Sequence, residues 1–134
     1  MSTTDAAANE SGTWLMVTPG ARLWLAADKK FFGPGVARLL MLIVKTGAIK
    51  AACAEMGVSY TKARKMVALV ESELGCAIVI SQQGGQHGSS SALTETGKEL
   101  LVRYKMFESE CEVLVKEAYA KSFDGFMRQP DNES

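Results

Sequence analysis

The stretch that decides the fold runs from Gly47 to Gly75 and reads GAIKAACAEMGVSYTKARKMVALVESELG. It predicts a short alanine-rich helix over 49–56, a stop at Gly57, and a longer helix that begins after Ser59. Ser59 is a favoured N-cap residue, because its hydroxyl accepts a hydrogen bond from a backbone N–H that the first helical turn leaves without a partner. Two helices joined by so tight a turn are typical of a helix-turn-helix, whose second helix enters the major groove of DNA.

The second helix has two faces of different chemistry. Its apolar face recurs at the spacing i, i+3, i+4, i+7, i+11, namely Ala63, Met66, Val67, Val70 and Leu74. Thr61, Lys65, Ala68 and Ser72 lie on the opposite side, and Lys62 and Arg64 flank them. The basic residues fall in the first two turns, the part of a recognition helix that reaches base edges. Glu71 and Glu73 follow in the last turn, where they would repel phosphate, so contact should be confined to the first half.

Eight residues are predicted to contact DNA. Lys62 and Arg64 suit phosphate, whereas Thr61 and Lys65 suit base edges. Tyr60 lies at the edge of the apolar face, so core packing and a hydrogen bond from its hydroxyl to phosphate both remain open. The complete set is Ser59, Tyr60, Thr61, Lys62, Arg64 and Lys65, with Gln86 and His87 from a loop farther along.

Shorter elements are predicted on either side. A strand over 21–26 (ARLWLA) precedes a helix over 36–45 that Pro34 introduces at a position tolerant of proline. This helix is apolar nearly all round and needs more covering than a small domain supplies. We therefore place Leu39 and Ile43 in a dimer interface. Strands over 77–81 and 92–93, joined by a Gly/Ser/Gln loop, predict a β-hairpin wing.

A long helix is predicted over 95–122, capped by Thr94. At 1.5 Å per residue it would be roughly 40 Å long, more than its own domain can cover. Apolar residues recur along it at steps of 4, 3, 4, 3 and 4, which is the seam of a coiled coil. Its first half should pack on its own domain and its second half on a second copy of the chain. The seam consists of Leu100, Tyr104, Phe107, Cys111, Leu114 and Ala118, and from Tyr104 onward we assign it to the dimer interface.

The 134 residues carry no net charge, but the charge is unevenly distributed. Residues 22–65 hold nine Lys or Arg and two acidic residues, a surplus of +7, whereas residues 1–21 carry −2 and residues 66–134 carry −5. Because local field rather than net charge attracts a phosphate backbone, this pattern is compatible with a nucleic-acid partner. No apolar run approaches the roughly 18 residues that span a membrane.

Other classes of function find little support. The three cysteines lack metal or redox spacing and read as reduced thiols, and the single histidine, His87, reads as a loop residue rather than a metal ligand. No nucleophile–histidine set or phosphate-binding glycine loop is present. We therefore expect a cytoplasmic protein that is not an enzyme and uses no cofactor.

Several sequence pieces together resemble the winged N-terminal DNA-binding domain of ModE-type molybdate-responsive regulators and, more distantly, LysR-type regulators. The similar pieces, in order, are LWL, FFGPG, GAIKAACAEMGVSY, a terminal ELG, GGQHG and LTETG, within about residues 22–120. The resemblance implies a winged helix-turn-helix dimer on a two-fold related operator, with residues 59–65 at the start of the recognition helix. The wing lacks Lys and Arg, and the oxyanion-binding module of full-length ModE is not found in this sequence. The sequence therefore supplies no evident molybdate site and no evident small-molecule ligand, and sensing is either absent or done by a partner.

The sequence thus predicts a mainly α-helical fold with a small β-wing. Residues 21–122 form a winged helix-turn-helix domain with a long C-terminal dimerisation helix, between tails at 1–20 and 123–134. The predicted function is a DNA-binding transcriptional regulator that acts on double-stranded DNA as a homodimer. The alternative is a protein-interaction module that kept this fold and lost specific DNA binding. A neutral wing and an acidic second half favour that alternative.

Overall fold

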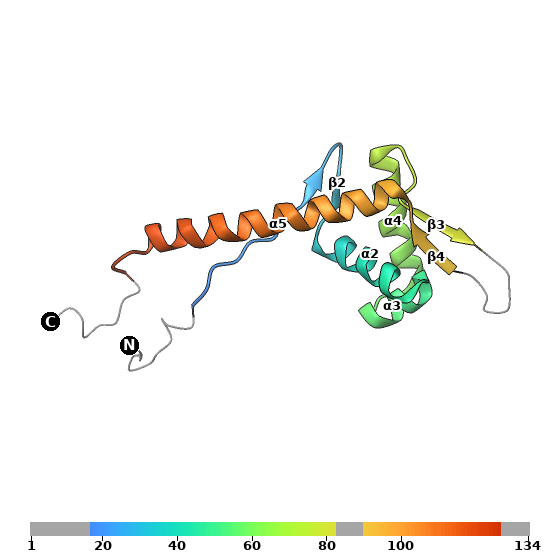
Figure 1. The fold of residues 1–134 in the computed structure, drawn as a ribbon, viewed down its shortest axis with the longest axis horizontal. Coiled ribbons are helices and arrows are strands. Elements are labelled where there is room, and N and C mark those ends of the chain that lie inside the picture. The colour runs from blue at the N-terminus through green and yellow to red at the C-terminus, as the bar shows by residue number, and fades with distance from the viewer. Residues whose placement is uncertain (1–16, 83–89, 127–134) are drawn as a thin grey trace. The chain divides into compact units, whose positions relative to one another are not determined.

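The computed structural model describes residues 17–82 and 90–126 (Figure 1). The chain divides into two compact units, one over residues 22–108 and one formed by residues 1–21 together with 109–134. The division falls inside the last helix, whereas the sequence placed the domain boundary at the end of that helix.

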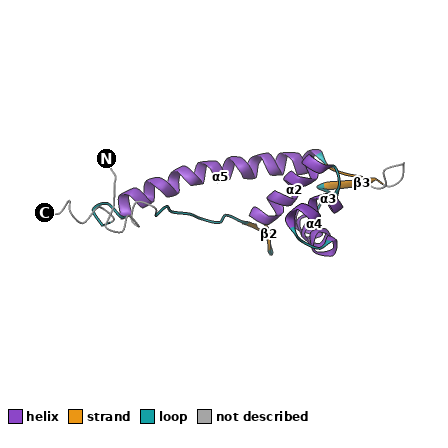
Figure 2. Ribbon diagram, turned by 90° about the horizontal axis from the view of Figure 1, so that it is seen from below, coloured by secondary structure: helices purple, strands orange, loops and turns teal. Residues whose placement is uncertain are grey.

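The first unit holds three short helices, two hairpins and the start of a long helix. Figure 2 shows the helices and strands of this unit from a second direction. Both hairpins are antiparallel pairs, β1 with β2 and β3 with β4. In chain order the elements are β1 (Leu25–Ala26), β2 (Lys30–Phe32), α2 (Pro34–Thr46), α3 (Ile49–Met56), α4 (Tyr60–Leu74), β3 (Val79–Gln82), β4 (Ser90–Leu93) and α5 (Glu95–Ser122).

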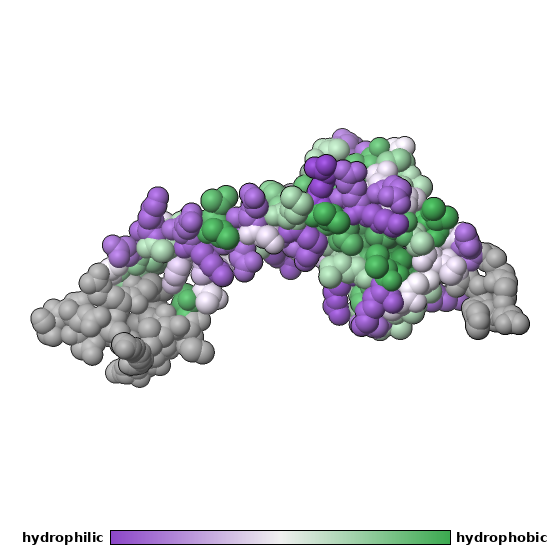
Figure 3. All heavy atoms as spheres, in the orientation of Figure 1, coloured by the Kyte–Doolittle hydropathy of each residue, from purple (hydrophilic) through white to green (hydrophobic). Residues whose placement is uncertain are grey.

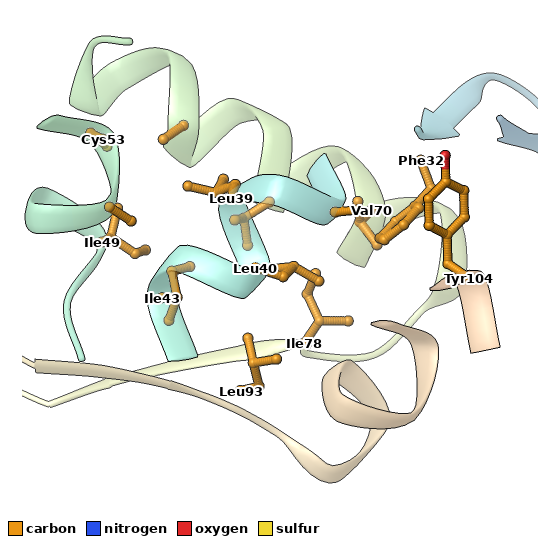
Figure 4. Close-up of a cluster of buried hydrophobic side chains, with 14 of the residues drawn as sticks. Phe32, Leu39, Leu40, Ile43, Ile49, Cys53, Val70, Ile78, Leu93 and Tyr104 are labelled. Atoms are coloured by element: carbon orange, nitrogen blue, oxygen red, sulfur yellow. The ribbon is translucent and has the colours of Figure 1, made fainter. Parts of the chain in front are cut away.

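Helix α2 lies at the centre of the core. Leu39, Leu40 and Ile43 have no exposed surface, and Figure 4 shows them in one cluster with buried side chains of other elements, among them Ile49, Val70 and Ile78. The prediction that Leu39 and Ile43 belong to a dimer interface is wrong. The hairpins and the two following helices bury these two side chains within one chain, whereas Met41 and Val44 on another side of the same helix remain exposed.

The turn of the helix-turn-helix forms as predicted. Gly57 adopts a left-handed conformation with φ of 75°, which residues with a Cβ rarely adopt. Its N–H donates to the carbonyl oxygen of Cys53 at 2.9 Å, and the N–H of Val58 donates to the same oxygen at 3.2 Å. These bonds satisfy carbonyl groups that the end of α3 would otherwise leave unpaired. α3 and α4 have the bounds that the spacing predicted.

The strands differ from their predicted bounds. The predicted strand over 21–26 is reduced to β1, which pairs with an unpredicted partner, β2, across an irregular register. In the wing, β3 begins at Val79 rather than Ala77, because backbone groups just before it are bonded elsewhere. The carbonyl oxygen of Ala77 accepts from the Thr94 hydroxyl at 2.8 Å, and the N–H of Ile78 donates to Glu71 Oε2 at 2.8 Å.

Helix α5 begins where the sequence predicted. Thr94 caps it, because its Oγ1 accepts from the N–H of Gly97 at 3.0 Å. Gly97 and Tyr104 are buried on the 22–108 unit. Tyr104 is only 2% exposed, so its assignment to a dimer interface is wrong: its ring belongs to the core of its own chain.

The described part of the second unit consists of residues 17–21 and 109–126. α5 ends in an aromatic turn in which the rings of Tyr119 and Phe123 lie 5.0 Å apart and those of Phe123 and Phe126 lie 6.0 Å apart. Figure 3 shows apolar side chains exposed between hydrophilic ones along α5. Among the described residues, no helix is long and apolar enough to cross a membrane.

Candidate nucleic-acid interface

Packing against the core determines which face of α4 is buried and which is exposed. Its Ala63, Val67 and Val70 are buried, so Thr61, Lys62, Arg64 and Lys65 are left exposed, as predicted. Ser59 caps the helix, because its Oγ accepts from the N–H of Lys62 at 3.0 Å. Leu74 departs from the predicted apolar face. It is exposed, and Leu69 packs against the core from a position that the predicted face omitted.

Tyr60 lies between two cations at the start of α4. The Nζ of Lys50 lies 5.9 Å from the centroid of the tyrosine ring, and Cζ of Arg64 lies 6.0 Å from it. These distances are at the outer limit of a cation–π contact. The tyrosine is 46% exposed and does not belong to the buried core, so of its two open roles core packing is wrong and the hydrogen bond to phosphate stays a prediction.

Sequence reasoning counted Lys50 in the basic segment but did not assign it to the site. It lies in the first turn of α3, whereas the other basic site residues lie on α4. The sequence feature that could have pointed to Lys50 was the charge surplus of residues 22–65. That surplus does not by itself tell which lysines lie close together in the fold. The turn between α3 and α4 brings Lys50 beside Tyr60.

The basic side chains of this surface have no acidic partner within reach among residues 17–82 and 90–126. In the described part of the chain, Lys50, Lys62, Arg64 and Lys65 form no ion pair within 4.0 Å. By contrast, Lys45 at the end of α2 pairs with Glu55 at 3.3 Å. The start of α4 therefore presents uncompensated positive charge, the property that draws in a phosphate backbone.

The two glutamates in the last turn of α4 accept hydrogen bonds from backbone amides. Glu71 Oε2 accepts from the N–H groups of Ile78 and Val79 at 2.8 and 3.2 Å. Glu73 Oε1 accepts from the N–H groups of Asp28 and Lys29 at 3.0 and 3.2 Å. The end of α4 is thereby tied to both hairpins. Sequence reasoning saw only that these carboxylates would repel phosphate.

The wing is anchored beside the start of α3. The N–H of Ser91 donates to the carbonyl oxygen of Gly47 at 2.8 Å, and Ser91 Oγ accepts from the N–H of Ile49 at 3.3 Å. Its strands pair in register from Val79 with Leu93 to Gln82 with Ser90. Gln86 and His87, predicted to contact DNA from the wing tip, lie outside the described residues.

The remaining seam residues of α5 have accessible side chains. Phe107, Leu114 and Ala118 are exposed and Cys111 is half-buried. Leu114 retains 60% of its surface. The assignment of these four residues to a dimer interface stays a prediction. The described residues hold no cluster of three or more His, Cys, Asp or Glu that could bind a metal ion.

The fold is a winged helix-turn-helix: three helices, a wing that follows the second helix of the motif, and a long C-terminal helix. A solved structure of the CbnR DNA-binding domain in complex with DNA superposes with a TM-score of 0.50 at 16% sequence identity. The match covers 66% of this chain and 95% of that one. ArgP from Mycobacterium tuberculosis gives a TM-score of 0.43 at 22% identity, over 69% of this chain and 31% of that one.

The sequence itself is similar to a curated protein. The molybdenum-pterin-binding protein MopB of Rhodobacter capsulatus is 35% identical over 71 residues, which are 53% of this chain. The match spans about a quarter, 26%, of that protein's length. No protein-family model matches the chain. The similarity to MopB and the fold shared with the CbnR domain confirm the resemblance to winged-helix DNA-binding domains.

Proposed function

We propose that the protein is a DNA-binding transcriptional regulator that inserts the first half of α4 into the major groove of duplex DNA. The observation that carries this proposal is the group of exposed cations around Tyr60, none of which has an acidic partner among the described residues. The shared fold supports it, since the second helix of such a motif is the one that enters the groove.

The geometry suggests distinct roles within this surface. Lys50, Lys62 and Arg64 neutralise phosphates, and the hydroxyl of Tyr60 donates to one. Thr61 and Lys65 reach base edges, and guanine suits Lys65 because it presents two acceptors in the major groove. Ser59 holds the start of the helix in place. Gln86 and His87 contribute further contacts to DNA in this proposal.

The regulator acts as a homodimer on a two-fold related operator, in the cytoplasm. Support comes from the apolar seam that α5 leaves exposed beyond Tyr104, at Phe107, Leu114 and Ala118. A helix pair along this seam would bury those side chains and relate two α4 helices by a two-fold axis.

A salt series tests the proposal. The affinity of the full chain for its own promoter DNA and for random duplex is measured at several salt concentrations. We expect affinity to fall steeply with salt, because each neutralised phosphate releases counterions. We also expect tighter binding to one promoter.

Paired variants sharpen this experiment. Lys65→Ala should weaken specific binding by about 1–3 kcal/mol, whereas Lys121→Ala, an exposed lysine near the end of α5, should leave it unchanged. Undetectable binding to any duplex at low salt would refute the proposal. It would favour the alternative, a protein-interaction module on the same fold.

A further inference from the structure

The first unit contains a pocket that the proposed function does not use. It has a volume of about 350 Å³ and lies between the β1–β2 hairpin, the start of α2 and the partly exposed side of α4 that carries Lys62, Met66 and Leu69. Its apolar walls include Trp24, Phe31, Phe32, Met66 and Leu69. This volume and an apolar lining are typical of sites for small organic ligands.

Among the residues that the structure describes, three cations line the same pocket and no acidic residue does. They are Arg22, Lys30 and Lys62, and none forms an ion pair with a described residue. The Nζ of Lys30 lies 4.3 Å from the centroid of the Trp24 ring, so the indole positions this ammonium group at the wall. The charge of the lining is therefore complementary to an anion.

The combination of apolar walls and three cations favours one chemical class of ligand. A free phosphate gains nothing from aromatic and methionine walls, and a neutral apolar molecule leaves three cations without a counter-charge. A DNA backbone carries charge at close, regular intervals along a hydrated surface, so it does not match an apolar recess. A small molecule with an apolar ring and one anionic group satisfies both kinds of lining.

We propose that this pocket binds a small amphipathic organic anion, of the class of aromatic carboxylates, and that the bound ligand opposes DNA binding. The opposition follows from Lys62, which lines the pocket and also belongs to the DNA-contacting surface at the start of α4. A carboxylate bonded to this ammonium group removes it from the phosphate. The opposition rests on the proposed function, whereas the binding itself does not.

The first test uses 2-naphthoate as a probe, titrated into the isotopically labelled full chain and followed by amide chemical shifts. Its neutral isostere 2-naphthamide and inorganic phosphate are titrated in parallel. We expect shifts at pocket residues such as Gly33, Gly35 and Leu69, and affinity for naphthoate at least about tenfold above that for either control, the scale of a hydrogen bond to a charged group. Equal affinity for naphthoate and either control, or shifts confined to α5, would overturn the proposal.

Three lysine variants separate the two surfaces. Lys30→Ala should weaken naphthoate binding about three- to tenfold and leave DNA affinity within about twofold, because Lys30 lies only at the pocket. Lys50→Ala, its matched control beside Tyr60, should do the reverse. Lys62→Ala should weaken both. If Lys30→Ala weakens DNA binding as much as Lys50→Ala does, the pocket wall is part of the DNA surface and the proposal is wrong.

A final measurement tests whether the bound ligand opposes DNA binding. Saturating naphthoate should weaken DNA binding, and saturating DNA should weaken naphthoate binding by the same factor, as linkage requires. If the chain binds both naphthoate and DNA and neither changes the affinity for the other, the claim that the ligand opposes DNA binding is wrong. If the chain binds no DNA at all, the proposed function fails, while the naphthoate titration still decides whether the pocket is a ligand site.

Discussion

The hydroxyl of Tyr104, in the middle of α5, donates a hydrogen bond to the backbone carbonyl oxygen of Leu23 at 2.8 Å, across 81 residues of sequence. Its ring packs edge-on against Phe32, with centroids 4.9 Å apart and an interplanar angle of 63°. One side chain thereby joins the long helix to both ends of the first hairpin. Burial, and secondarily the Glu108 carboxylate beside it, raises the pKa of Tyr104 from 10.0 to about 12.

We expect Tyr104→Phe to lower the free energy of unfolding at pH 7 by about 0.5–1.5 kcal/mol, the value of one hydrogen bond. The raised pKa also makes the wild-type bond sensitive to alkali. The folded state holds this proton more tightly than the unfolded state, so its contribution is complete below pH 10 and is lost as the pH rises from about 10 to 12. Denaturant unfolding across this range should show the gap between wild type and variant closing. A constant gap would contradict the assignment.

Gly97 in the first turn of α5 lies against the start of the wing. A Cβ at this position would overlap the carbonyl oxygen of Ile78, which is backbone and cannot swing aside. We expect Gly97→Ala to destabilise the fold by about 1–3 kcal/mol, despite alanine's higher helix propensity. Gly35→Ala is the control, since the nearest atom to its added Cβ is the flexible Met66 terminus at 3.9 Å. If thermal unfolding finds Gly35→Ala less stable than Gly97→Ala, the close approach of Gly97 to Ile78 is refuted.

Glu71 fastens the end of α4 to the wing through two backbone amides. Glu71→Ala leaves the N–H groups of Ile78 and Val79 without this acceptor in a partly buried position, which should cost about 2–4 kcal/mol. Ser72→Ala, an exposed change one residue away, should alter stability by less than about 0.5 kcal/mol. Amide exchange of Ile78 and Val79 gives the local readout. Protection that survives in Glu71→Ala would show that another acceptor serves these amides.

Leu114 tests the proposed dimer. Leu114→Glu would place an unpaired charge in the seam and should weaken self-association by about 3 kcal/mol. Val113→Glu is the matched control, since Val113 is 55% exposed and lies one position off the seam. Sedimentation over a range of concentrations should find the first variant monomeric and the second dimeric. A Leu114→Glu variant that stays dimeric would locate the interface elsewhere.

Periodicity was enough to predict the helices, because helix boundaries depend on neighbours in sequence. Gly57 and Ser59 mark the turn through their own backbone and side-chain chemistry, and Thr94 marks the start of α5 in the same way. The exposed face of α4 followed from the spacing of its apolar residues. The strands were predicted less well, since each depends on a partner that lies elsewhere in the chain.

The assignment of residues to surfaces needed the tertiary structure. The sequence of an apolar helix is the same whether a second chain or its own chain buries it. Only the packing in the structure showed that Leu39, Ile43 and Tyr104 are buried by their own chain. Likewise, Glu71 and Glu73 are acidic residues in the sequence and backbone acceptors in the fold.

The sequence by itself determined the helix-turn-helix, the cap at Ser59 and the basic half of α4, because these arise from residues a few positions apart. Only the tertiary structure decided which cations converge on Tyr60 and which line the pocket with Trp24. Those groups come from different elements, and their proximity is set by how the elements pack. Local spacing carries no information about that arrangement.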